Sequence, residues 1–185
     1  MCLDMTKHVA IVVDWFGPYD REGAVAAARR DFGSGMYMCI GKHKYQKSSS
    51  RLQYIGISDN LCNRISDPDH HVLAKMTQEL KIWLGEIATY GVPGKKNKAT
   101  DPQLDLAEWL HIYFLRLPLT EKKMEHPPYT PATVLNRWWF TDYETPRKQR
   151  PSPCWPDLID FLGVDHGARV IWFGRKTVRW SPSDF

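Results

Sequence analysis

Two short runs of β-forming residues, 35–41 and 52–58, place the strongest constraint on how this chain folds. Both are rich in the apolar and aromatic residues that favour strands, and a serine-containing segment, 42–51, separates them. The pattern predicts an antiparallel hairpin with a long loop. The apolar runs 8–15 and 81–88 predict two further strands, so a sheet must form the centre of the fold.

Helices are indicated elsewhere along the chain. The alanine-rich range 21–30 predicts one helix, and Ser58 is a suitable N-cap for a second over 59–65. The clearest helix opens at 101–102 and stops before Pro118. Its apolar residues recur every three or four positions: Leu104, Ala107, Leu110, Phe114 and Leu117.

The remaining ranges give weaker signals. Range 91–100 predicts a loop, 133–140 is aromatic and ambiguous between helix and strand, and 141–156 predicts a proline-rich connection. A short helix over 157–162 and a hairpin of 168–173 with 177–180 complete the interpretation. The predicted fold class is α/β (α+β), a small, mainly antiparallel β-sheet flanked by helices, with an extra N-terminal strand and a C-terminal β-hairpin.

Length and composition favour one globular domain over 1–185. A chain of 185 residues with 43% hydrophobic and 25% charged residues is neither disordered, collagen-like nor a coiled coil. Its longest apolar runs stop far short of the roughly 18 residues that a membrane span needs. The first residues lack the pattern of a secretory signal, so a cytoplasmic protein without a membrane partner is expected.

The cysteine spacing excludes a typical zinc site, and the charge distribution points to one basic segment. The four cysteines, at positions 2, 39, 62 and 154, form no CxxC pair and have no histidine at zinc spacing, so reduced thiols are expected. The net charge is only +4, but Lys42, Lys44, Lys47 and Arg51 lie in one segment that has no carboxylate.

The triplets Gly35-Met36-Tyr37 and Tyr54-Ile55-Gly56, followed by Arg64 and then by Glu108 on a later helix, closely resemble the GIY-YIG nuclease family. The resemblance covers about 35–136, which leaves 1–34 and 141–185 as N- and C-terminal extensions. Ten residues separate Tyr54 from Arg64, as at the family's second-strand-to-helix junction. Met36 replaces the family's isoleucine, and the long interval from Tyr37 to Tyr54 resembles the restriction-enzyme branch.

The resemblance implies a metal-dependent endonuclease that hydrolyses phosphodiester bonds in DNA. Tyr37 would be the general base, Tyr54 would hydrogen-bond the water or the phosphate, and Arg64 would stabilise the phosphate. Glu108 would be the lone protein ligand of Mg²⁺ (or Mn²⁺). Asn136 would be the family's asparagine, and accessory histidines would come from His43, His70 and His71.

Duplex DNA is the expected partner, and the basic segment would contact its phosphates through Lys42, His43, Lys44, Lys47 and Arg51. Arg175, Lys176 and Arg179 offer a second DNA-facing surface. Two alternatives stay open: a catalytically inactive nucleic-acid-binding module of the same fold, and an RNA-cleaving toxin or mobile-element nuclease. Taken singly, each strand tyrosine also fits a purely structural role in the core. The sequence does not indicate an oligomeric state.

Overall fold

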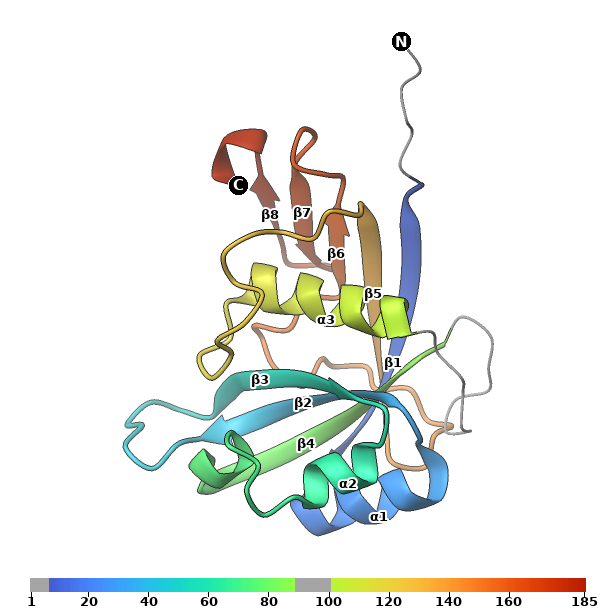
Figure 1. The fold of residues 1–185 in the computed structure, drawn as a ribbon, viewed down its shortest axis with the longest axis vertical. Coiled ribbons are helices and arrows are strands. Elements are labelled where there is room, and N and C mark those ends of the chain that lie inside the picture. Colours follow the sequence, from blue (N-terminus) through green and yellow to red (C-terminus); the bar gives the residue numbers. More distant parts are fainter. Residues whose placement is uncertain (1–6, 89–100) are drawn as a thin grey trace.

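The structure is a computed structural model that describes residues 7–88 and 101–185, and a single eight-stranded sheet forms its centre (Figure 1). The strands follow the order β3-β2-β4-β1-β5-β6-β7-β8 across the sheet. Their bounds are β1 (Val9–Tyr19), β2 (Gly35–Lys42), β3 (Arg51–Ser58), β4 (Gln78–Ile87), β5 (Ala132–Trp139), β6 (Leu158–Phe161), β7 (Ala168–Trp172) and β8 (Lys176–Trp180). The helices are α1 (Arg21–Asp31), α2 (Leu61–Ser66) and α3 (Asp101–Leu115), and the short 3₁₀ turns are η1 (Leu73–Lys75) and η2 (Pro182–Asp184).

Strand β1 lies in the middle of the sheet. It pairs antiparallel with β4 and parallel with β5, so Val13 has Ile87 on one side and Asn136 on the other. The other neighbouring strands pair antiparallel. The N-terminal strand is therefore central to the sheet, where the sequence had indicated an extension, and it continues through Gly17-Pro18 to Tyr19.

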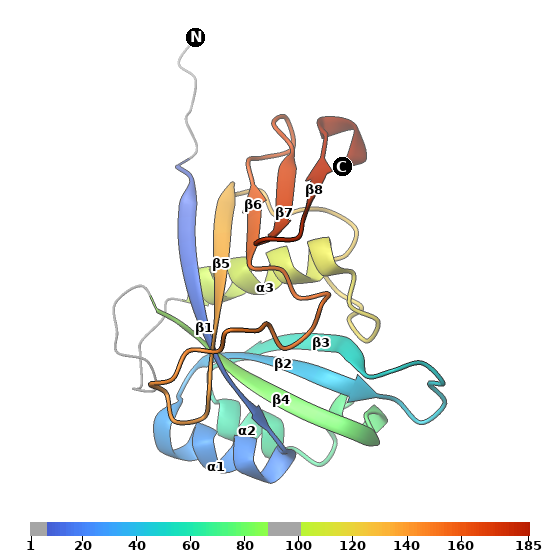
Figure 2. The same ribbon diagram turned by 180° about the vertical axis from the view of Figure 1, so that it is seen from behind.

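The helices cover opposite faces of the sheet (Figures 1 and 2). Side chains alternate along β2: Met36 and Met38 pack in the core beneath α3, whereas Tyr37 and Cys39 pack with α1 and α2. The strand is buried on both faces, which explains its continuous apolar composition. Consecutive residues from Met36 to Cys39 therefore lie in different layers.

The mixed α+β class is confirmed, with a larger sheet than expected. The hairpins β2–β3 and β7–β8 form as predicted, and so do α1, β4 and α3. The ambiguous range 133–140 lies almost entirely in strand β5, and 141–156 is the irregular connection. The loop predicted at 91–100 and Cys2 lie outside the described residues. How the chain divides into a core and extensions stays a prediction.

Two local predictions are wrong. The range 157–162 contains a strand, β6, because Leu158–Phe161 pairs with β5 on one side and β7 on the other. Periodicity cannot separate helix from strand in so short a run. The cap of α2 is Asn60, whose side chain accepts a hydrogen bond from the backbone N–H of Asn63 at 2.9 Å. Ser58 accepts from the N–H of Asn60 instead.

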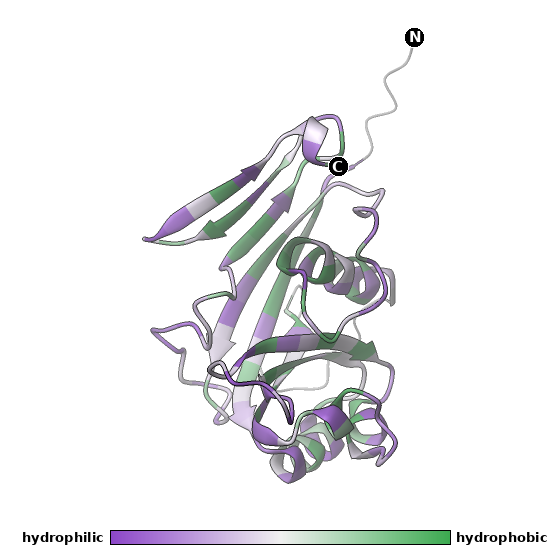
Figure 3. Ribbon diagram, turned by 90° about the vertical axis from the view of Figure 1, so that its left-hand side faces the viewer, coloured by the Kyte–Doolittle hydropathy of each residue, from purple (hydrophilic) through white to green (hydrophobic). Residues whose placement is uncertain are grey.

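The two edges of the sheet differ. At one edge, the backbone N–H of Leu119 donates to the carbonyl of Gln53 at 2.9 Å, so a loop covers part of β3. At the other, β8 is largely exposed and carries Lys176 and Arg179. Both hydrophilic and hydrophobic residues occur along the C-terminal strands, β6 to β8 (Figure 3).

The lengths of the helices and the state of the cysteines bear on two of the sequence predictions. No helix in the described ranges is long and apolar enough to span a membrane. Cys39, Cys62 and Cys154 are free thiols, as the sequence predicts. Burial raises the pKa of the Cys39 thiol to about 12, so this thiol stays protonated and unreactive at neutral pH.

The two tyrosine–glycine triplets have a packing explanation. Tyr37 lies directly across from Gly56 on the neighbouring strand. A Cβ atom at position 56 would lie 2.7 Å from the Tyr37 hydroxyl oxygen and ring carbon Cζ. Only glycine leaves room for the Tyr37 ring on this face of β3.

We predict that Gly56→Ala lowers the free energy of unfolding by about 1–3 kcal/mol, as overpacking of a buried site does. Urea denaturation measures the change. Gly33→Ala is the matched control, because a Cβ at position 33 meets no atom within 4 Å. Equal stability of the two variants would show that the Tyr37 ring does not need this space.

Candidate functional site

Five predicted site residues lie together on the face covered by α1 and α2. Tyr37 comes from β2, Tyr54 from β3, Arg64 from α2, and His70 and His71 from the segment before η1. Tyr37 and His70 are buried, Tyr54 and Arg64 are half-buried, and His71 is exposed. We call these five residues the Tyr37 cluster; it runs from a buried floor to the protein surface.

The rings of the cluster are in contact, in tilted, edge-to-face and stacked pairs. The centroid of Tyr54 lies 5.8 Å from Tyr37 and 6.0 Å from His70. His70 and His71 stack with 5.4 Å between centroids and 8° between planes. Such contacts hold the rings in fixed orientations, so the polar atoms of the cluster are positioned by packing.

Hydrogen bonds define the tautomer of His70. Its Nδ1 accepts from the backbone N–H groups of Val72 and Leu73 at 3.2 and 3.3 Å. A neutral His70 must therefore carry its proton on Nε2, which lies 2.7 Å from the Tyr37 hydroxyl oxygen. His70 donates this hydrogen bond, and Tyr37 accepts it.

Arg64 supplies a second donor to the same oxygen. Its Nε donates to the Tyr37 hydroxyl oxygen at 3.3 Å. Because both groups donate to that oxygen, the Tyr37 O–H itself is not used in either hydrogen bond. Donors on the oxygen also polarise the O–H bond and strengthen it as a donor.

Burial controls the charge of both groups. Desolvation raises the pKa of Tyr37 far above its usual value and outweighs the opposing effect of Arg64, so Tyr37 is neutral at pH 7. Desolvation, together with the positive charge of Arg64, lowers the pKa of His70 to about 4. The fold by itself therefore favours a protonated phenol, and the role of Tyr37 as general base stays a prediction.

Glu108 and Asn136 lie elsewhere. Glu108 is on α3, across the sheet from Tyr37, and its Oε2 accepts from Lys123 Nζ at 2.7 Å. Asn136 is buried on β5, where its Oδ1 accepts from Trp15 Nε1 at 2.7 Å and its Nδ2 donates to the Pro156 carbonyl. Both have structural partners, and the sheet separates them from the Tyr37 cluster.

No group of three or more His, Cys, Asp or Glu side chains suited to a metal ion occurs within 7–88 and 101–185. The Mg²⁺ (or Mn²⁺) requirement therefore stays a prediction from the sequence. So do duplex DNA as the partner and phosphate contacts by Lys42, His43, Lys44, Lys47 and Arg51.

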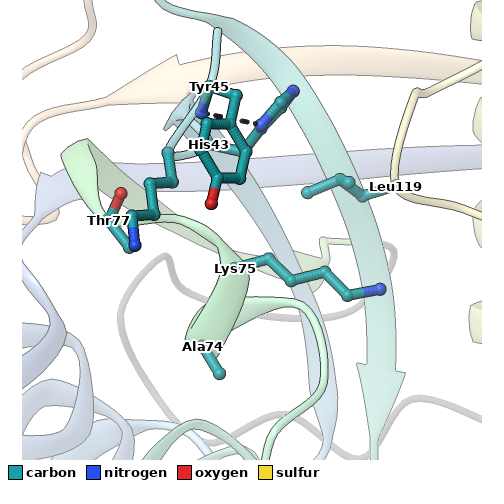
Figure 4. Close-up of a pocket in the computed structure, with 7 residues that line it drawn as sticks. His43, Tyr45, Ala74, Lys75, Thr77 and Leu119 are labelled. Carbon is teal, nitrogen blue, oxygen red and sulfur yellow. Dashed lines mark hydrogen bonds between the residues drawn. The ribbon is translucent and has the colours of Figure 1, made fainter.

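The basic segment 42–51 lies at the tip of the β2–β3 hairpin and borders a pocket (Figure 4). The pocket is lined by His43, Lys44, Tyr45, Ala74, Lys75, Thr77 and Leu119. Tyr45 is 80% exposed, and its backbone N–H donates to His43 Nδ1. Lys42 donates to Glu79 at 2.8 Å, so one of the predicted cations has a carboxylate partner.

The sequence analysis missed several residues that shape the Tyr37 cluster and the pocket at the hairpin tip. The backbone N–H groups of Val72 and Leu73 set the tautomer of His70, and Gly56 makes room for Tyr37. Of these, only Gly56 had a signal in the sequence, as the last residue of the second triplet. It also missed Lys75 and Leu119 at the hairpin-tip pocket, because tertiary folding brings them there.

Comparisons with known proteins do not support the nuclease resemblance. No family model matches the chain, and no solved structure matches it. Among curated proteins, the chain is similar to glutathione S-transferase Mu 6 from Mus musculus, with 26% identity over 160 residues. The matched region is 83% of this chain and 69% of the mouse protein.

This similarity contradicts the GIY-YIG resemblance and the endonuclease activity inferred from it. It does not support a phosphodiester hydrolase, and it supports neither the inactive nucleic-acid-binding module nor the RNA-cleaving alternative. The position of Glu108 across the sheet from Tyr37 agrees with this correction.

We predict that His70 makes the fold less stable in acid. Its pKa is lower in the folded chain than the usual value of about 6.5, so the unfolded chain binds its proton first. The contribution is complete above pH 6.5 and falls by at most about 1.4 kcal/mol per pH unit between pH 6.5 and about 4.

Urea denaturation of the wild type and His70→Gln at pH 7, 6 and 5 measures this contribution. The wild type should lose more stability than the variant over this range, because glutamine does not titrate. His43→Gln is the control, and it should keep the wild-type slope. Parallel wild-type and His70→Gln curves would show that His70 protonates as easily in the folded chain.

Proposed function

We propose that this chain is a glutathione S-transferase-like enzyme that binds a small thiol in the Tyr37 cluster and joins an electrophile to its sulfur. The observation that carries the proposal is the Tyr37 hydroxyl oxygen, which belongs to a neutral phenol and accepts from both Arg64 and His70, so its own O–H is left to donate to a ligand. The name of the mouse relative makes glutathione the first thiol to test.

A thiolate suits this donor set. A free thiol has a pKa near 8.5, and hydrogen-bond donors and positive charges favour its anionic form. The Tyr37 O–H supplies one charge-assisted hydrogen bond, and the Arg64 guanidinium supplies the positive charge. Neither group becomes ionised or neutralised in the process, so the cluster stabilises the thiolate without a proton transfer of its own.

Tyr37 itself is fully buried, so in this proposal the thiol reaches it from the side of its partly exposed neighbours. Tyr54 and Arg64 are half-buried and His71 is exposed, so they form the rim of the cluster. Arg64 also offers guanidinium nitrogens beyond the Nε that contacts Tyr37, and these match the carboxylates of a peptide thiol. We assign Arg64 and the rim to ligand binding, and Tyr37 to the sulfur.

The transfer balances with an activated aryl chloride as the electrophile. The thiol proton goes to solvent, and the thiolate sulfur forms a bond to the ring carbon that carries chlorine. The carbon–chlorine bond then breaks, and chloride leaves with its electron pair. The products are the thioether and chloride, and no oxidant or reductant is needed.

Two measurements test the function. Isothermal titration with reduced glutathione at pH 7 should give saturable binding, and addition of 1-chloro-2,4-dinitrobenzene should give thioether at a rate proportional to the protein. Heat-denatured protein is the control for the uncatalysed reaction. An absence of both binding and catalysed conjugation would overturn the proposal.

We predict that Tyr37→Phe lowers kcat/KM for conjugation by about 10²-fold, as loss of one preorganised donor to a developing anion does. The ring and its packing on Gly56 are kept. Tyr45→Phe is the matched control, because Tyr45 is 80% exposed and lies at the hairpin tip; its activity should be unchanged.

The pH profile separates a role at the sulfur from a structural role of Tyr37. Loss of the donor should move the apparent pKa of the bound thiol upward, so the Tyr37→Phe variant should recover part of its activity at higher pH. An unshifted profile together with a lowered melting temperature would show that Tyr37 only supports the fold.

A further inference from the structure

A second cleft lies away from the Tyr37 cluster, beside the irregular connection that follows β5. It encloses about 480 Å³, within the roughly 300–1,000 Å³ typical of small-ligand sites. Its walls come from the end of β5, the segment 147–153 and the β7–β8 turn. The lining residues are Trp138, Arg147, Lys148, Gln149, Arg150, Pro153, Asp157, Phe173, Gly174 and Arg175.

The charge of this cleft is strongly unbalanced. Four of the lining side chains are cations: Arg147, Lys148, Arg150 and Arg175. Asp157 is the one carboxylate among the lining residues, and its Oδ2 already accepts from Arg150 Nη2 at 2.5 Å and from the Phe173 backbone N–H at 2.7 Å. The lining residues therefore carry more positive than negative charge, because Asp157 can balance only one of the four cations.

Packing holds two of these cations in place. The guanidinium of Arg147 lies 4.4 Å from the centroid of Phe140 and 5.3 Å from that of Trp83. Arg150 donates to Asp157 and to the carbonyl of Phe173, which ties the connection to the β7–β8 turn. Fixed cations lose little side-chain entropy when they bind an anion, so the cleft is preorganised.

Three residues that line the cleft carry buried donors without acceptors. Within the described residues, the buried Nε1 of Trp138 and the Nε atoms of Arg147 and Arg150 have no hydrogen-bond partner. Buried donors in folded proteins are nearly always satisfied. An anion in the cleft would add acceptor oxygens to a wall that is rich in donors and poor in acceptors.

We infer that this cleft is a binding site for a phosphate-bearing ligand. A phosphate or diphosphate group carries more than one negative charge and offers several oxygens to the planar forks of arginine. Lys148 and Arg175 are exposed and stand at the opening, where they attract the anion, and Arg147 forms the fixed part of the site. The inference is independent of the thiol site.

Isothermal titration of the full chain with sodium pyrophosphate tests the inference. We predict saturable binding, and we predict that the double variant Lys148→Gln with Arg175→Gln binds at least about tenfold more weakly, because two charge-assisted contacts are lost. Both side chains are exposed, so the melting temperature should stay close to the wild-type value.

The matched control removes the same charge elsewhere. Arg29→Gln with Lys122→Gln changes two exposed cations outside the cleft and should keep the wild-type affinity. Equal weakening in both double variants would mean that net charge alone attracts pyrophosphate, and it would overturn the site. So would the absence of saturable binding to the wild type.

Competition identifies the source of the phosphate. If the group belongs to a small ligand, ATP should displace pyrophosphate and a short DNA duplex at the same phosphate concentration should not. Stronger displacement by the duplex, lost in the Lys148→Gln, Arg175→Gln variant, would assign the site to a nucleic-acid backbone. Failure of glutathione binding would leave every one of these measurements unaffected.

Discussion

The backbone ladder of β1 is the interaction on which the rest of the structure depends. β1 pairs with β4 on one side and with β5 on the other, so it joins β2–β4 to β5–β8 within one sheet. Trp15 on this strand packs against Gly85 of β4 and donates to Asn136 of β5. The Tyr37 cluster lies on one side of β1 and the cationic cleft on the other, so each site relies on this strand for its position.

The sequence predicted elements better than it predicted layers. Apolar runs and caps located α1, α3 and the hairpin β2–β3, because these depend on residues close together in the chain. Glu108 was expected beside Tyr37, but α3 packs on the opposite face, and no local pattern says which face a helix covers. The sequence pattern grouped the residues of the Tyr37 cluster correctly. The protonation states of Tyr37 and His70, however, depend on burial, which follows only from the assembled fold.

The triplets that resemble a nuclease motif meet a requirement of packing. The Tyr37 ring lies against Gly56, so a tyrosine on one strand and a glycine on its neighbour are complementary in shape whatever the chemistry. That geometry places a phenol between a guanidinium and a neutral imidazole. In the proposed function, the neutral phenol is a hydrogen-bond donor to an anionic ligand and does not remove a proton from it.

The exposed strand β8 has a consequence for how copies of the chain behave in solution. An open strand edge offers unpaired backbone groups to any other strand, and this is the usual start of aggregation. Lys176 and Arg179 place positive charges along this edge, so two such edges repel each other. At the far edge, the loop at Leu119 occupies part of β3. The β8 edge of the sheet is therefore protected by like charges and the β3 edge by a loop that covers part of it. Both features disfavour edge-to-edge association of chains at high concentration.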